Sequence, residues 1–248
     1  MVAPLHYEKE GRKNMAVRYV ARTNDLWLRV QLEPGPIVSV PYGLKVEFLE
    51  TKAGRDRFTI VEEVNKGKLA SVPSRPVQPY LTSSIVHRPA VLLTFDRKTQ
   101  RLSLPGRMPI NAFSGGGHRG FTAIAAGTYE LAIPAYPSAQ TRPAYSRWTR
   151  YHNLWFRIGT ATSGSRFLHP GAISEGCVTV RQFIYDPTSR LPPPDGFTDL
   201  TQLARFEPGL IGLPLPTTIA MTFGWDKVVD ALILARLNDQ AIGRLVVV

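Results

Sequence analysis

Cysteine is the scarcest residue of this 248-residue chain, and Cys177 is its single representative. One cysteine excludes an intrachain disulfide, so the fold must be stable without such a cross-link. The thiol itself is either a small buried hydrophobe or a reactive nucleophile. Histidine is also rare, with five residues scattered along the chain. Because no cluster of His, Cys and carboxylates shows metal-ligand spacing, we expect no metal site.

Long apolar runs are missing as well. No stretch of about 18 apolar residues occurs, which is the length that a membrane-crossing helix requires, so we expect no membrane span. Charged residues also interrupt the first 20 residues, where a secretory signal would need an apolar core: Glu8, Lys9, Glu10, Arg12 and Lys13. We therefore expect a protein that is made in the cytoplasm without a classical signal peptide. An external site of action would require another export route.

Acidic residues are in deficit, with 19 Asp and Glu against 30 Lys and Arg. The resulting net charge of +11 favours anionic partners such as nucleic acid, anionic lipid or an anionic wall polymer. The basic residues, however, are spread along the chain without a run of five, and no nucleic-acid motif accompanies them. We therefore expect no nucleic-acid partner. Such binding would predict steep salt-dependent retention on DNA.

Proline and glycine are plentiful, with 21 and 20 residues, and they punctuate many short apolar runs. This rhythm predicts a mainly β protein. Alternation at Leu26, Leu28 and Val30 is typical of a half-buried strand, and several such runs follow within residues 16–72. They indicate a small barrel in a first domain, residues 1–75, which resembles the bacterial SH3-like modules.

The proline-rich residues 76–89 are predicted to be a semi-rigid linker. A second domain, residues 90–248, opens with an apolar strand at 91–95. A polar turn then leads to a returning strand at 101–104, which together form a hairpin. At the C-terminal end, the apolar residues 231–248 predict a second hairpin around Asn238-Asp239-Gln240.

The most informative segment is residues 166–180. A strand delivers His169 into a short Pro/Gly loop, which returns through Ser174 and Gly176 to Cys177 at the start of another strand. A loop of seven residues allows the two side chains to meet, and an imidazole can then take the proton of a thiol whose ordinary pKa is about 8.5. Gly176 permits a tight turn, and the N–H groups of Gly176 and Cys177 are candidate oxyanion donors.

The same spacing is also compatible with a structural role. Cys177 would then be buried beside a turn, and His169 would only cap the loop. The spacing alone does not separate this interpretation from catalysis. The order of the residues does argue against papain-like cysteine peptidases, in which the cysteine precedes the histidine.

The pattern Ser174-x-Gly176-Cys177, with a strand histidine upstream, resembles the signature of the L,D-transpeptidase (YkuD-like) catalytic domain. Residues 92–104, the Gly-rich residues 113–117 and residues 123–131 are similar to other segments of that domain, so the resemblance covers about residues 90–182. It implies a β-sandwich in which Cys177 is the nucleophile and His169 the general base. It also implies that Ser174 supports the site and orients the imidazole through backbone contacts, and that Gly176 lies next to the oxyanion donors.

The resemblance implies acyl transfer on peptidoglycan stem peptides, as transpeptidation, carboxypeptidase action or D-amino-acid exchange. The implied mechanism requires no cofactor. Arg157 and Arg166 are candidates to hold a substrate carboxylate. The family usually has Arg at the position of Thr179, and Arg181 is the candidate substitute. Glu175 also departs from the family pattern, in which His or Lys is common.

The short loop between His169 and Cys177 is similar to that of divergent members, which bacteria deliver through type VI secretion as antibacterial effectors. For such a toxin the resemblance implies the periplasm or cell wall of a target cell as the site of action. A secretion apparatus and an immunity protein are then the implied partners. The alternative is a non-catalytic cell-wall-binding or structural protein that retains the fold.

Overall fold

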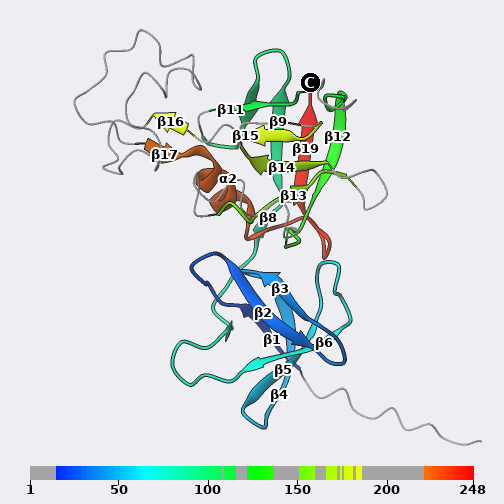
Figure 1. Cartoon of the computed structure of the whole chain (residues 1–248), viewed down its shortest axis with the longest axis vertical. Coiled ribbons are helices and arrows are strands. Elements are labelled where there is room, and N and C mark those ends of the chain that lie inside the picture. The colour runs from blue at the N-terminus through cyan, green and yellow to red at the C-terminus, as the bar shows by residue number, and fades with distance from the viewer. Residues whose placement is uncertain are drawn as a thin grey trace, which may run out of the picture.

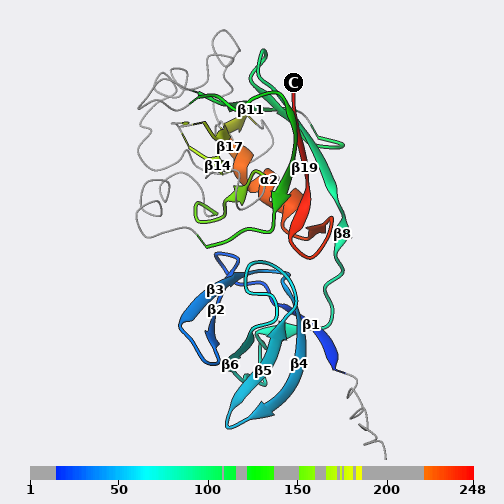
Figure 2. The same cartoon turned by 90° about the vertical axis from the view of Figure 1, so that its right-hand side faces the viewer.

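The predicted mainly β class is confirmed. The computed structural model describes residues 15–107, 109–115, 122–136, 151–159, 166–171, 174, 176–180, 183–185 and 221–248. Within these ranges nearly all regular structure is β-strand, arranged in two units that Figures 1 and 2 show one above the other.

The first unit is a seven-stranded antiparallel sheet that curls into a nearly closed barrel (Figures 1 and 2). Its strand order is β3-β2-β6-β5-β4-β1-β7. Buried and exposed residues alternate along its strands, as at Leu28 and Val30, so one face of each strand lines the barrel core. The strands are β1 (Ala16–Val20), β2 (Trp27–Leu32), β3 (Ile37–Pro41), β4 (Lys45–Lys52), β5 (Arg55–Ile60), β6 (Leu69–Pro73) and β7 (Leu81–Thr82).

The segment predicted as a linker, residues 76–89, is not a free connection. Strand β7 lies within it and pairs with β1 through Val20 and Leu81. The short strand β8 (Arg88–Pro89) ends it and pairs with β18 (Ala235–Arg236) near the C-terminus. The backbone groups of both strands are used in sheet pairing, which the proline content did not reveal.

The second unit is built on an eight-stranded mixed sheet with the order β12-β19-β9-β10-β11-β15-β14-β13. The pairs β19–β9 and β14–β15 are parallel. A bridge between Leu131 and Ile158 brings the two edges of the sheet together, so the sheet curls around its own core. Its strands are β9 (Val91–Asp96), β10 (Arg101–Ser103), β11 (Ile110–Phe113), β12 (Gly127–Ala132), β13 (Phe156–Arg157), β14 (Phe167–Pro170), β15 (Val178–Val180) and β19 (Ala241–Val247).

The opening hairpin is present as β9 and β10, with Asp96 opposite Arg101. The turn predicted at residues 238–240 is also present, with Leu237 N–H donating to Ala241 O at 2.8 Å, but the strands on its two sides do not form a paired hairpin. Strand β19 runs between β12 and β9, so both of its edges are occupied and β18 pairs with β8 instead. The helix α2 (Gly224–Leu232) and the pair β16 (Phe183–Tyr185) and β17 (Met221–Phe223) complete the described elements. No helix in the described ranges is long and apolar enough to cross a membrane.

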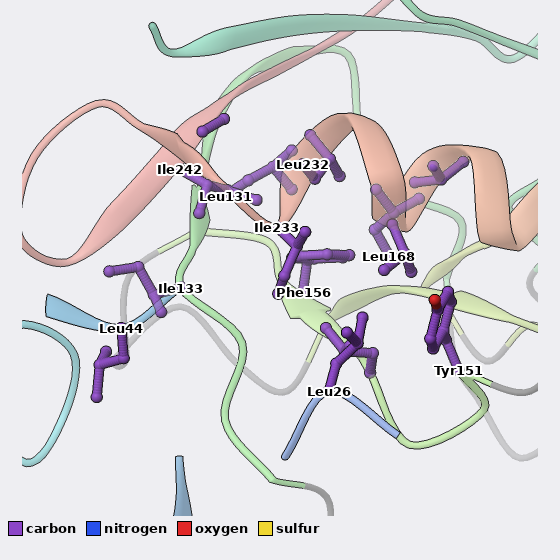
Figure 3. Close-up of a cluster of buried hydrophobic side chains, with 14 of the residues drawn as sticks. Leu26, Leu44, Leu131, Ile133, Tyr151, Phe156, Leu168, Leu232, Ile233 and Ile242 are labelled. Carbon is purple, nitrogen blue, oxygen red and sulfur yellow. The ribbon is translucent and has the colours of Figure 1, made fainter. Parts of the chain in front are cut away.

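One hydrophobic cluster runs through both units. Figure 3 shows Leu26 and Leu44 of the barrel beside core side chains of the second unit, among them Ile133 and Phe156. Helix α2 contributes the fully buried Trp225, whose indole N–H donates to the backbone of Tyr151 at 3.0 Å. Because this burial spans the junction, the two units share one core.

Candidate functional site

Strands β14 and β15 bring His169 and Cys177 to the same face of the sheet. The parallel register pairs Leu168 with Val178 and His169 with Thr179. Successive side chains of a strand point to opposite faces. His169 therefore shares a face with Thr179, and Cys177, which directly precedes β15, continues that face. The register is compatible with the predicted meeting of the imidazole and the thiol, which stays a prediction.

The hydrogen bonds of His169 fix its tautomer. Nδ1 lies 2.8 Å from the carbonyl oxygen of Pro170. A carbonyl can only accept, so the ring proton sits on Nδ1 and Nε2 carries the lone pair. The hydroxyl of Thr179 lies 3.2 Å from Nε2 and donates to it. The imidazole thus presents its basic nitrogen on the face that it shares with the thiol.

His169 is covered by an aromatic side chain. The ring of Trp155 stacks on the imidazole, with centroids 4.5 Å apart and planes 21° from parallel. The Trp155 indole N–H donates to His152 O at 2.9 Å, which holds this ring in place. His169 is 4% exposed, and burial lowers its pKa to about 4. At neutral pH the imidazole is therefore uncharged, and burial makes it a weaker base than an exposed histidine.

The buried neutral imidazole predicts a specific loss of stability in acid. In the unfolded chain the pKa of this histidine is about 6.5. Since the folded pKa is about 4, the unfolded state binds the proton first as the pH falls. The contribution of His169 is fully present above about pH 6.5 and is lost between there and about pH 4, which amounts to about 3 kcal/mol.

Urea unfolding at pH 7 and pH 4 measures this loss. His169→Asn is the matched control, because an amide can still donate to Pro170 O but does not titrate. Between pH 7 and pH 4, the free energy of unfolding of this variant should fall by about 3 kcal/mol less than that of the wild type. Equal pH slopes for the two proteins would contradict the assignment of a buried, neutral imidazole.

Cys177 is 8% exposed and accepts a hydrogen bond at its sulfur. The donor is the backbone N–H of Phe167, 3.4 Å from Sγ. A donor at this position favours the thiolate over the thiol, because it interacts more strongly with the charged form. The strand that carries His169 therefore also supplies a hydrogen-bond donor to the sulfur of Cys177.

Gly176 has the left-handed conformation that its identity allows, with φ +78°. A Cβ at this position would lie 2.7 Å from the carbonyl oxygen of Thr122, so a larger residue does not fit. Its N–H donates to Gly115 O at 3.0 Å. The prediction that this N–H is an oxyanion donor is therefore wrong for the observed geometry, because the Gly-rich loop already uses it.

Ser174 contacts the backbone at Cys177. Its hydroxyl donates to the carbonyl oxygen of Cys177 at 2.7 Å. The role that the resemblance implies, orientation of the imidazole, stays a prediction. This bond ties Ser174 to the backbone of Cys177.

The three candidate arginines differ in their surroundings. Arg157 is opposite Phe167 and therefore lies on the same face as Cys177, and its guanidinium makes no ion pair or hydrogen bond with the described residues. Arg166 donates to Thr122 Oγ1 at 3.3 Å, beside Gly176. Arg181 lies outside the described residues, as does Glu175. Arg157 is thus the guanidinium best placed for a substrate carboxylate.

Sequence reasoning missed two residues of the site. Thr179 was noted only as a departure from the family pattern, and Trp155 was not singled out. The signal for Thr179 was its position two residues beyond Cys177 in a strand, which places both on one face. Nothing in the sequence indicated the Trp155 stack. In the described ranges no three His, Cys or carboxylate side chains converge as a metal site requires.

A scan against protein-family models finds no match for this chain. A search of curated proteins and a search of solved structures likewise find no significant match. The site must therefore be interpreted from its own geometry and from the sequence motif.

Proposed function

We propose that the protein catalyses cysteine-dependent acyl transfer on peptidoglycan stem peptides, as an L,D-transpeptidase or L,D-carboxypeptidase. The observation that carries the proposal is the position of His169 in β14 and of Cys177 directly before β15, on one face of the sheet. The Nδ1–H···O bond to Pro170 supports it further, because this bond leaves the basic nitrogen on that face.

The proposed reaction begins with proton transfer from the thiol of Cys177 to Nε2 of His169. For this transfer the Thr179 hydroxyl, which donates to Nε2 at rest, must turn away or relay the proton. The thiolate then attacks the carbonyl carbon after the third residue of a stem tetrapeptide. A thioester forms, the peptide C–N bond breaks, and the imidazolium protonates the leaving amine of D-Ala.

The thioester is resolved in one of two ways. An incoming amine gives transpeptidation or D-amino-acid exchange, and water gives carboxypeptidase action. His169 takes the proton of the incoming nucleophile, and the thiol of Cys177 is restored. In this mechanism Arg157 pairs with the substrate carboxylate, since its guanidinium has no other partner among the described residues.

The burial of the site favours a second candidate function. Both Cys177 and His169 are less than a tenth exposed, as expected for a structural pair in a non-catalytic wall-binding or structural protein. The catalytic proposal therefore requires that substrate reaches a thiol covered at rest.

The test is to incubate the protein with tetrapeptide-stem muropeptides and a free D-amino acid, and to analyse the products by mass spectrometry. Loss or exchange of the terminal D-Ala is the expected result. Tripeptide-stem muropeptides are the matched control, because they lack the bond that is cleaved. No change in the tetrapeptide sample, with the protein folded, would contradict the catalytic proposal and favour the second candidate.

A further inference from the structure

A cleft of about 660 Å³ lies at the junction of the two units, and its lining shares no residue with the His169–Cys177 site. Cavities of this volume are typical of small-molecule and peptide sites, which often form between domains. The lining residues are Arg29, Ile37, Val38, Ser39, Glu63, Val64, Asn65, Ala135 and Tyr136.

One wall of the cleft combines a cation with an exposed apolar side chain. Arg29 and Ser39 are opposite each other in the β2–β3 ribbon, and Ile37 lies two residues from Ser39 on the same face. Arg29 is exposed and makes no hydrogen bond or ion pair with the described residues. Ile37 is 55% exposed. An unpaired guanidinium next to an aliphatic side chain suits a ligand with one anionic group and one apolar group.

Another part of the lining is the loop that carries Glu63. This residue has the left-handed φ of +61°, which is unfavourable for a non-glycine residue. Contacts from the second unit hold it there, because its N–H donates to Asp239 O at 2.8 Å and Gln240 Nε2 donates to its carbonyl at 3.0 Å. Strained residues that the surrounding structure enforces are common at ligand sites. The loop is thus fixed before any ligand arrives.

The carboxyl group of Glu63 adds to the character of this part of the lining. It is buried and accepts from Val64 N–H at 2.9 Å and from Asn65 Nδ2 at 2.7 Å. Burial raises the pKa of the Glu63 carboxyl, which weakens its repulsion of an anion in the cleft. Val64 is 59% exposed and presents a second aliphatic surface.

We propose that this cleft binds the C-terminal carboxylate of a peptide whose last side chain is aliphatic. Arg29 holds the carboxylate, and the aliphatic side chain lies against Ile37 and Val64. A phosphate is a poorer fit, because Arg29 is the only basic residue of the lining and a charge near −2 requires more cations. The proposal does not depend on the proposed catalytic function.

Titration calorimetry with N-acetyl-alanyl-leucine tests the proposal, and the C-terminal amide of the same dipeptide is the ligand control. The free acid should bind at least about tenfold more tightly than the amide. Arg29→Gln should reduce this preference by about the same factor, and Ile37→Ser should weaken binding of both ligands. Arg101→Gln is the matched protein control, because it removes the same charge from an exposed position on β10.

Three results would overturn the proposal. The first is equal binding of acid and amide, or no binding of either. The second is an equal loss with Arg29→Gln and Arg101→Gln, which would indicate only the general positive field. The third is a dimer in solution that Ile37→Ser dissociates, which would make this face a contact between copies of the chain.

Discussion

Cys177→Ala should leave D-Ala release from tetrapeptide muropeptides at least about three orders of magnitude below the wild-type rate. The reason is that the thioester cannot form without the sulfur, and no other cysteine can replace it. Intact-protein mass spectrometry provides a second readout. The wild type should gain the mass of the acyl group when the acceptor amine is withheld, and Cys177→Ala should gain nothing.

The fold of this variant can be checked separately from its activity. The substitution removes one buried atom and the acceptor of the Phe167 N–H, so we expect a cost of about 1–2 kcal/mol. Cys177→Ser is the matched variant, since a hydroxyl keeps an acceptor at this position but is a far weaker nucleophile. A folded Cys177→Ala protein that still releases D-Ala would show that another residue is the nucleophile.

The same pair of proteins tests the hypothesis of an antibacterial effector. When directed into the periplasm of a bacterium, the wild type should stop growth, and Cys177→Ala should be tolerated. A harmless wild type would refute the effector role. If both proteins were toxic, the toxicity would not depend on acyl transfer.

Local patterns predicted the parts of the fold that depend on neighbouring residues. Alternation at Leu28 and Val30 predicted β2, and the apolar run followed by a polar turn predicted the β9–β10 hairpin. Each of these features arises within about ten residues, where the period of a strand or the chemistry of a turn decides the structure.

Pairings between distant segments could not be predicted. The C-terminal hairpin failed because β19 lies between β12 and β9, both more than 100 residues earlier in the chain. The prediction of a linker at residues 76–89 missed a distant pairing in the same way, since β8 pairs with β18. Sequence periodicity carries no information about which strand occupies an edge.

The candidate site likewise combines features that the sequence predicted with features that it did not. The spacing of His169 and Cys177 predicted that they could meet, but their parallel strand pairing was not apparent, because parallel neighbours usually need a longer crossover. Strands β14 and β15 have only four and three residues, so a short connection can lead from one to the start of the other. The hydrogen bond from the Gly176 N–H to Gly115 O was also hidden, because it depends on the position of a loop 61 residues earlier in the chain.

Arg236→Met should destabilise the protein by about 3–5 kcal/mol, because it leaves the buried Glu62 carboxylate without its cation. Arg236 Nε lies 3.2 Å from Glu62 Oε2, and both side chains are less than a tenth exposed. The same guanidinium donates to Gly43 O of the barrel at 3.1 Å. Methionine fills much of the volume of the arginine stem, so the loss reports mainly on the charge and its hydrogen bonds.

Two controls identify the cause. Arg57→Met breaks ion pairs with Glu33 and Glu50 in which Arg57 is 29% exposed, and should cost less than about 1 kcal/mol. Glu62→Gln combined with Arg236→Met removes both charges and keeps an acceptor for the N–H of Lys45, which donates to Glu62 at 2.9 Å. The double variant should therefore be more stable than Arg236→Met alone.

His87 makes the effect dependent on pH. Its Nδ1 lies 3.6 Å from Glu62 Oε1. Burial lowers the pKa of His87, and the charge of Arg236 lowers it further. Without Arg236 that pKa should rise, so that at pH 5 the imidazolium can replace the lost cation beside Glu62. In urea unfolding, the loss of stability that Arg236→Met causes should therefore be smaller at pH 5 than at pH 8. An equal deficit at both pH values would mean that the guanidinium acts through packing and not through its charge.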